Sequence, residues 1–597
     1  MKTILFPAGF ILHFCYLTVS GSDRPVVYTD LGEIEGKLSN VRGRLIETYL
    51  GIPFALPPVH ELRFKPPLPP KPWVERFKAV KKAPGCFQER DRVFPGFQGS
   101  DAWNAEKITE DCLYLNIWRP ANAYNASVMV WIFGGAFMTG SPSLDLYDGA
   151  MLASVENVIV VNINYRVSAF GFLYFNTTSV PGNVGLLDQR LALQWVKNHI
   201  INFGGSPDQI TLFGESAGSA SVHAHMISKP SWPLFRYAIL QSGVMLNTWA
   251  CLPPSKAYHR SQRLAELLGC PVGPDTPLAN IIECVREQPA EKVSAAVSKV
   301  EVRAMDFTFP PVCQDPYFFT TDVHSAVRRG QFKPTSIIIG IMKDEGSFWL
   351  PYYLPTYFDN QSTSLLSRQS FSDCARLLFK GYYNPILIKS ISYQYGNIAN
   401  CESISQQGEF LRNATNHMLG DHFFSVDVVD FGKEYKKKIK EQGSVFMYYM
   451  EKRVANNPWP EWMGAMHGYE IPYIFGRPVT APDKFSKFEE EFSMKIMHFW
   501  ANFAKYGRPA APGVWPEMMP ENRLQFLVIG TNDIYVGEDL KKTEIEFWRE
   551  LRSISKERDR FDVYTQRASC HEDNKLTLLC LTVIFLVSNS FTAKLFY

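Results

Sequence analysis

Residues 211–218, with the sequence Thr-Leu-Phe-Gly-Glu-Ser-Ala-Gly, constrain this chain more than any other stretch. The pattern Gly-x-Ser-x-Gly after an apolar run is typical of a buried strand that turns sharply into a helix and presents a serine hydroxyl above a sheet. Glycines suit such a strained turn, because the backbones on either side of it come close together. Amides at the start of the helix can hold developing negative charge. Ser216 is therefore a candidate nucleophile.

The size and charge of the chain set broad limits. It has 597 residues, 46% of them hydrophobic, so it can bury a large core. Its 40 prolines and 39 glycines are scattered, and we find no linker, repeat or low-complexity block. One catalytic domain over residues 22–565 is the simplest interpretation. The formal net charge of +2 argues against a nucleic-acid or membrane-surface role.

Several apolar runs predict the type of sheet. Residues 128–133 and 158–162 are continuously apolar rather than alternating, and residues 337–340 and 445–449 read as further strands. Residues 186–203 are apolar at helical spacing. Continuous strands between helical patterns indicate a mostly parallel sheet covered on both faces, which is the α/β class. Together with the serine turn and the Gly134-Gly135 strand end, this predicts an α/β-hydrolase fold.

Both ends of the chain carry targeting patterns. Residues 1–21, with Lys2 before an apolar core and small residues after it, read as a secretory signal peptide. Residues 566–597 form a tail in which a small polar site precedes an apolar run. This resembles a GPI-attachment signal with Asp573 or Asn574 as the attachment residue, and a direct tail anchor is the alternative. Glycosylation motifs at Asn125, Asn176, Asn360 and Asn413 fit an extracellular chain.

The cysteine count also favours secretion. Of eleven cysteines, Cys15 lies in the signal and Cys580 in the tail, which leaves nine. An odd number in a secreted chain indicates one intermolecular bridge or one free thiol. Cys570, beside the tail, is the candidate for a bridge between two subunits.

Two segments carry a family resemblance. Residues 110–116 (Glu-Asp-Cys-Leu-Tyr-Leu-Asn) and the stretch from Phe203 to Gly218 resemble the two signatures of type-B carboxylesterases. The resemblance extends from about residue 25 to about residue 560. Within that family the chain is similar to the cholinesterases, acetylcholinesterase-like and of an invertebrate kind. The resemblance implies a serine esterase that works through an acyl-enzyme.

The serine needs a base, and the base needs an acid that fixes its tautomer. In this fold the order along the chain is nucleophile, acid, histidine. Asp344 and Glu345 both offer the acid on sequence alone, and His467 in a Gly-rich segment offers the base. By similarity to the cholinesterases, Glu345 is the acid and His467 the base.

The same resemblance assigns the oxyanion hole to the amides of Gly135, Ala136 and Ala217, with Ala136 in place of the usual third glycine. A quaternary ammonium cannot donate a hydrogen bond, so aromatic faces and nearby negative charge must hold it. The family positions implied for substrate binding are Trp103, Phe348, Glu215, Glu470, Asp91, Tyr352 and Trp459, and those implied for the acyl pocket are Met305, Phe307 and Trp349.

The chain also departs from the cholinesterase pattern. Glu89 and Met138 replace residues at the mouth of the site, and no tryptophan falls between residues 293 and 306, so the peripheral cation site looks weakened. A family disulfide is missing from residues 421–427 and from its distal side ahead of Phe547. The resemblance leaves Cys86–Cys112 and Cys270–Cys284 as expected bridges. Pairing stays open for Cys251, Cys313, Cys374 and Cys401.

The sequence thus predicts an extracellular serine hydrolase of acetylcholine and related choline esters. A general carboxylesterase acting on neutral esters is the alternative enzyme. A catalytically dead adhesion protein is the alternative of another class, and the intact Ser216, Glu345 and His467 argue against it. We expect no cofactor and no metal. We expect a homodimer, a lipid anchor or secretion, and a synaptic location if the source tissue is neuronal.

Overall fold

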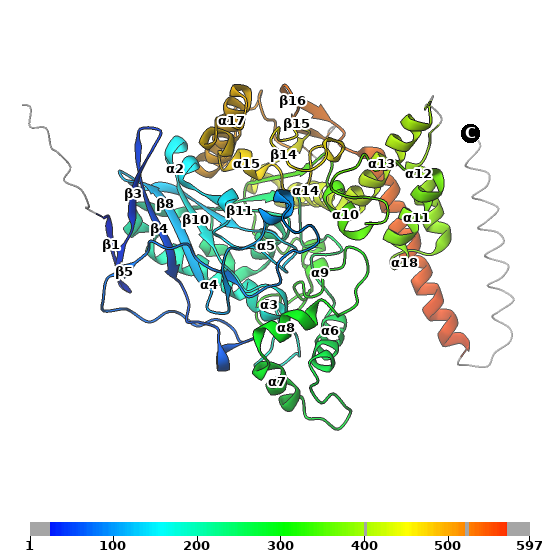
Figure 1. The fold of residues 1–597 in the computed structure, drawn as a ribbon, viewed down its shortest axis with the longest axis horizontal. Coiled ribbons are helices and arrows are strands. Elements are labelled where there is room, and N and C mark those ends of the chain that lie inside the picture. The colour runs from blue at the N-terminus through cyan, green and yellow to red at the C-terminus, as the bar shows by residue number, and fades with distance from the viewer. Residues whose placement is uncertain (1–23, 399–400, 402, 520–523, 570–597) are drawn as a thin grey trace, which may run out of the picture.

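The computed structural model describes residues 24–398, 401, 403–519 and 524–569 (Figure 1). The predicted signal peptide, Cys570 and the candidate lipid-attachment residues lie outside this part of the chain. Within the described ranges, no helix combines the length and the apolar character needed to cross a membrane.

A large sheet forms the centre of the molecule. Its order in the described chain is β16-β15-β14-β13-β12-β11-β9-β10-β8-β4-β3. The strands are β3 (Lys37–Val41), β4 (Arg44–Pro53), β8 (Tyr114–Pro120), β9 (Ala126–Ile132), β10 (Ile159–Ile163), β11 (Gly205–Glu215), β12 (Tyr237–Gln241), β13 (Ile337–Met342), β14 (Val445–Met450), β15 (Gln525–Ile529) and β16 (Ile534–Glu538). All neighbours from β15 to β10 pair in parallel, while the outer pairs are antiparallel.

The central strands have few polar side chains because helices cover both of their faces. Every residue of β9, β10 and β13 is buried, as the continuous apolar runs predicted. Helices α2 and α17 pack together on one side of the sheet, and α4 and α5 lie on the other (Figure 1). The expected α/β-hydrolase architecture is confirmed.

The remaining elements surround this centre. Helices of the covering layers are α2 (Ala150–Glu156), α3 (Ser168–Phe172), α4 (Val184–His199), α5 (Ala217–Ile227), α14 (Val426–Ile439) and α17 (Lys487–Tyr506). Outer helices are α6 (Pro254–Leu267), α7 (Leu278–Glu287), α8 (Ala290–Val297), α9 (Val323–Arg328), α11 (Arg368–Phe379), α12 (Pro385–Tyr395), α13 (Ile404–Gly420) and α18 (Lys542–Ser569). Short elements are α1 (Gln98–Asp101), α10 (Leu350–Tyr353), α15 (Ile471–Ile474), α16 (Arg477–Thr480), β1 (Val26–Thr29), β2 (Gly32–Glu35), β5 (Phe77–Lys78), β6 (Gly85–Cys86) and β7 (Ile108–Thr109).

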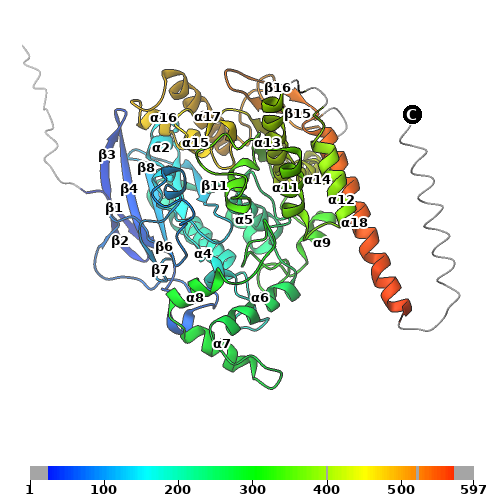
Figure 2. The same ribbon diagram turned by 45° about the vertical axis from the view of Figure 1, so that its right-hand side comes forward.

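Two features bear on function. The last half of α18 extends beyond the body of the molecule in both views (Figure 1, Figure 2). Parallel strands that are adjacent or nearly so form the centre of the sheet, among them β9, β11, β13 and β14. Their carboxyl ends therefore meet at one edge, and the segments that follow them carry the candidate site.

Candidate active site

The serine turn has the strained geometry that its sequence predicts. Strand β11 ends at Glu215, α5 begins at Ala217, and Ser216 between them has φ 58° and ψ −122°. A Cβ atom on Gly218 would lie 2.0 Å from the Ile132 carbonyl oxygen. A Cβ on Gly214 would lie 2.6 Å from the backbone of Gly218. Only glycine allows α5 to approach β9 this closely, so both glycines are needed to hold the serine up.

His467 meets Glu345 in this structure. Nδ1 of His467 donates to Oε2 of Glu345 at 2.6 Å, and the other carboxylate oxygen accepts the Met342 amide at 2.8 Å. Both side chains are buried. The opposite ring atom, His467 Nε2, has no hydrogen-bond partner among the described residues. It does lie within ion-pair distance of Oε1 of Glu215, at 3.1 Å, and both Ser216 and His467 line the same cavity.

Asp344, the other candidate acid, does not contact the His467 ring but binds the chain near it. Its carboxylate accepts hydrogen bonds from Asn416 Nδ2 at 2.8 Å and from the Ala465 amide at 2.9 Å. The Asp344 amide in turn donates to the Ala465 carbonyl at 3.0 Å. These contacts fasten the segment that carries His467, two residues farther along, without touching the imidazole.

The loop after β9 supplies the candidate oxyanion donors. Gly135 has φ 108° and Ala136 has φ 60°, so both lie in the left-handed region, and both line the cavity. Among the described residues, the amides of Gly135, Ala136 and Ala217 have no protein acceptor. Ala217 is the first residue of α5, where an amide lacks an intrahelical partner. Ala136 keeps its donor but holds a conformation that an alanine adopts with strain.

Three buried glutamates surround His467 and govern its charge. Nε2 of His467 lies 3.1 Å from Oε1 of Glu215, and Glu470 accepts a hydrogen bond from Gln241 at 3.1 Å. Burial, helped by the other carboxylates, raises the pKa of Glu215 and of Glu470. Burial alone would lower the pKa of His467, but the attraction of Glu215 and Glu345 outweighs it and raises that pKa.

A cavity of about 540 Å³ is lined by both Ser216 and His467. Its wall includes most of the residues assigned to the substrate, namely Trp103, Glu215, Phe348, Trp349, Tyr352, Phe307 and Asp91. Glu215 and Trp103 both approach the same glycine, because a Cβ on Gly468 would lie 3.3 Å from one and 3.4 Å from the other. The negative charge and the aromatic face therefore meet beside His467.

Three assigned residues do not line the cavity, namely Trp459, Met305 and Glu470, which is buried and accepts the Gln241 hydrogen bond. Trp459 is buried and packs edge-on against Phe97 with ring centroids 4.7 Å apart, so it supports the aromatic wall from outside. Met305 is fully buried in the hydrophobic core, and its φ of 60° marks a sharp turn of the loop. Phe307, two residues on, is the residue of this loop that faces the cavity.

The cavity mouth includes charged residues that sequence reasoning missed. Asp91 accepts from the Tyr352 hydroxyl at 2.6 Å, and its amide donates to Asn104 Oδ1 at 2.8 Å. Arg90 and Arg92, on either side of Asp91, line the same opening. The only sequence signal that these arginines line the cavity was their position beside Asp91. That signal was weak, because charged loop residues are common on any protein surface.

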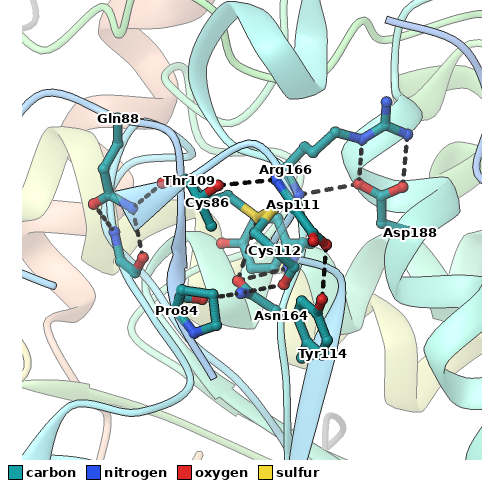
Figure 3. The surroundings of a disulfide bond; sticks show 12 residues. Pro84, Cys86, Gln88, Thr109, Asp111, Cys112, Tyr114, Asn164, Arg166 and Asp188 are labelled. Carbon is teal, nitrogen blue, oxygen red and sulfur yellow. Dashed lines mark hydrogen bonds and ion pairs between the residues drawn. A yellow bond between two sulfur atoms is a disulfide. The ribbon is translucent and has the colours of Figure 1, made fainter. Parts of the chain in front are cut away.

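The loop that carries Trp103 is tied down at its ends by the Cys86–Cys112 disulfide (Figure 3). Gln88 exchanges two hydrogen bonds with the backbone of Gly140, at 2.7 and 2.8 Å. Asn164 donates to the Cys112 carbonyl at 2.7 Å. These anchors connect the loop to the segments after β9 and β10, so Trp103 keeps its place relative to the reacting serine.

Comparisons with known proteins agree with this geometry. Residues 23–548 match the carboxylesterase family. The chain belongs to that family. It is accordingly a serine carboxylic ester hydrolase. Acetylcholinesterase 4 of Caenorhabditis briggsae is 40% identical to it, over 98% of this chain and 99% of the relative. The acetylcholinesterase of Electrophorus electricus is 39% identical (85% and 84% covered), and the cholinesterase of Mus musculus 38% (88% and 86%).

The cysteines of this esterase form three bridges in the described chain. Cys86–Cys112 and Cys270–Cys284 are present as the resemblance implied, and Cys251–Cys313 resolves a pairing that the sequence left open. Cys374 and Cys401 are not bonded. His324 lies within 4.8 Å of the Cys251 and Cys313 sulfurs, but those sulfurs are bonded to each other and are not thiolate ligands. Of the four glycosylation motifs, Asn125, Asn176 and Asn413 are exposed and Asn360 is half-buried.

Proposed function

We propose that this esterase hydrolyses acetylcholine and related choline esters through an acyl-enzyme intermediate. The observation that carries the proposal is the wall shared by Trp103, Glu215 and Ser216. An aromatic face and a buried carboxylate attract a cation that has no hydrogen-bond donors, and both lie within one cavity of the nucleophile. Phe348 adds a second aromatic face to the same wall.

The proposed reaction has two half-reactions, acylation of Ser216 and hydrolysis of the acyl-serine, and the same groups act in both. Ser216 Oγ attacks the ester carbonyl while His467 Nε2 accepts its proton, and Glu345 stabilises the imidazolium. The amides of Gly135, Ala136 and Ala217 bind the developing oxyanion. His467 then gives the proton to the departing choline oxygen. In the second half, His467 activates a water that attacks the acyl-serine and releases the acid.

The Trp103→Ala variant tests the substrate class. It should lower kcat/KM for acetylthiocholine about tenfold or more, the value of one desolvated cation–π contact, and affect a neutral acetate ester much less. Val93→Ala, at an exposed position of the same opening, is the matched control and should change neither substrate. Equal losses on both substrates in Trp103→Ala would favour the alternative, a general carboxylesterase on neutral esters.

Ser216→Ala tests whether the chain is an enzyme at all. The variant should lose turnover by about 10⁴-fold or more while keeping the thermal unfolding midpoint of the parent. Full turnover without the hydroxyl would remove the esterase mechanism. A natural lack of turnover in the parent would favour the non-catalytic adhesion protein instead.

We further propose that the acyl group faces Phe307 and Trp349, whose ring centroids are 5.7 Å apart on one side of the cavity. Met305 contributes to this pocket only by filling the core under the loop. One methylene in an apolar pocket discriminates by about 1–3 kcal/mol, so selectivity should be graded. Acetyl esters should be best, propionyl esters close behind, and butyryl esters poor but measurable.

The remaining proposals concern location and assembly. We propose a secreted catalytic domain, residues 22–565, released from the signal peptide and held at the cell surface by a lipid attached at Asp573 or Asn574. Cys570 would link two subunits. A phospholipase that cuts GPI anchors should then release activity from membranes, and Cys570→Ser should abolish a reductant-sensitive dimer. Activity that stays on the membrane after the lipase would indicate a direct tail anchor.

A further inference from the structure

One wall of the cavity is made by a loop with no helix or strand. Residues 301–311 follow α8 without regular structure, yet they place the ring of Phe307 against the rings of both Trp249 and Trp349. The centroid distances are 5.9 Å and 5.7 Å. Trp349 also packs on His467 at 5.6 Å. An irregular loop keeps such a wall in shape only if other contacts hold it, because loops open at low free energy when few contacts restrain them.

The first set of contacts surrounds Asp306, the residue before Phe307. Its carboxylate is buried and pairs with Arg303 at 2.9 Å and with Arg260 of α6 at 3.1 Å. Arg260 also donates to the carbonyl oxygens of Phe307 and Thr308. One planar guanidinium thus binds the Asp306 side chain and the carbonyl oxygens of the next two residues, Phe307 and Thr308.

The second contact is covalent. The Cys251–Cys313 disulfide closes a 62-residue separation and joins the end of the loop to the segment that follows Trp249. Beside it, the Leu252 amide donates to the Pro311 carbonyl and the Cys313 amide to the Leu252 carbonyl, both at 2.8 Å. The disulfide therefore holds the loop that carries Phe307 against the segment that carries Trp249, one of the two ring partners of Phe307.

We propose that the Cys251–Cys313 disulfide and Arg260 are positioning residues that set the largest acyl group this esterase accepts, because together they hold Phe307 in the cavity wall. The inference rests on the proposed function, which places the acyl group at that wall. Neither residue lines the cavity, so neither acts by contact with substrate.

The chain offers a matched control for the disulfide. Cys251→Ser with Cys313→Ser should raise the ratio of butyrylthiocholine to acetylthiocholine kcat/KM about fivefold or more, within the range that one or two methylenes allow. The kcat for acetylthiocholine should change little, since the triad is untouched. Cys270→Ser with Cys284→Ser removes a disulfide between α6 and α7 and should leave the ratio unchanged. An unchanged ratio in both variants, or an equal rise in both, would overturn the proposal.

A second pair of variants keeps the test decisive if the serine variants fail to fold. Arg260→Lys keeps the charge but lacks the planar fork, and it should raise the same ratio. Arg263→Lys, exposed on the same helix, is its control. No rise in Arg260→Lys overturns the proposal. Phe307→Ala distinguishes the proposed function from the further inference. If Phe307→Ala leaves the ratio unchanged, the acyl group does not face Phe307 and the proposed acyl pocket is wrong. If Phe307→Ala raises the ratio but the disulfide and Arg260 variants do not, only the positioning role of the disulfide and Arg260 is refuted.

Discussion

At the scale of single residues, two adjacent carboxylates both help to position His467, the proposed catalytic base. Glu345 contacts the imidazole of His467, and Asp344 binds the backbone of the segment that carries it. The carboxylates are neighbours in sequence, but they bind different partners. Their roles can be separated by neutral, nearly isosteric substitutions.

Glu345→Gln should lower kcat by about 10³- to 10⁴-fold with little change in KM, because an amide no longer stabilises the imidazolium or its tautomer. Asp344→Asn should act mainly through stability, lowering the thermal unfolding midpoint while kcat falls far less. Steady-state kinetics and thermal melts of both proteins check this. A larger kcat loss in Asp344→Asn than in Glu345→Gln would contradict the assignment.

A second residue-scale prediction concerns pH. The carboxylate of Glu215 favours the imidazolium and so raises the pKa of His467, while the active form of His467 is neutral. Activity is therefore lost as pH falls through that pKa. Glu215→Gln removes the charge, lowers the pKa of His467, and should move the acid limb of the kcat/KM profile to lower pH.

The profile is best measured with a neutral ester, so that loss of cation attraction does not enter. Asp91→Asn is the control, because Asp91 bonds to Tyr352 rather than to His467 and should leave the limb in place. A shift to higher pH in Glu215→Gln would mean that Glu215 does not act on His467 as a negative charge.

At the scale of elements, the site depends on how closely α5 approaches β9. Strand β11 lies between β9 and β12 in parallel register, and the helix that follows it turns back across its own strand and its neighbour. The close contact of Gly218 with the Ile132 carbonyl sets the position of the helix start, and with it the amide of Ala217. The serine turn and the proposed oxyanion hole therefore depend on the same close packing.

Gly218→Ala should destabilise the fold by about 1–3 kcal/mol or more, because the new methyl meets backbone that cannot move aside. The turnover of the folded protein should also fall, because a shift of α5 moves the Ala217 amide, a proposed oxyanion donor. Gly513→Ala, where a Cβ would meet nothing within 4 Å, is the control and should stay within about 0.5 kcal/mol of the parent. Chemical unfolding and turnover of the folded fraction measure both effects.

At the scale of the whole molecule, ion pairs join the two regions in which, by the family resemblance, a disulfide is missing. Lys541, just before α18, pairs with buried Asp421 at 2.7 Å, and Arg552 of α18 pairs with Asp427 at 2.6 Å. The rings of His422 and Trp548 also contact each other, tilted, with centroids 4.5 Å apart. The missing cysteines thus coincide with charged and aromatic contacts that attach α18 to the body.

Lys541→Ala should destabilise the protein by about 3–5 kcal/mol, because it leaves the buried Asp421 without its cation. Lys542→Ala, at the exposed neighbouring position, should be nearly neutral. Equilibrium unfolding of both proteins decides the matter. Equal stabilities would show that α18 is held by its apolar contacts alone.

The amino-acid sequence was enough to predict the features that depend on short stretches of chain. The serine turn around Ser216 could be predicted because it requires glycines at a fixed spacing. The parallel sheet was readable because strands covered on both faces are continuously apolar, as in residues 128–133. The family resemblance added the assignment of Glu345 and His467, which residue types alone left open between Glu345 and Asp344.

Which distant residues come into contact could be read only from the folded chain. The Cys251–Cys313 bridge and the Lys541–Asp421 pair each join segments whose separation in sequence carries no local pattern. The same holds for Met305 in the core and Phe307 in the cavity wall, since both are apolar residues of one irregular loop. Such choices follow from packing and strand register across the whole fold, and a single sequence does not encode them within any short window.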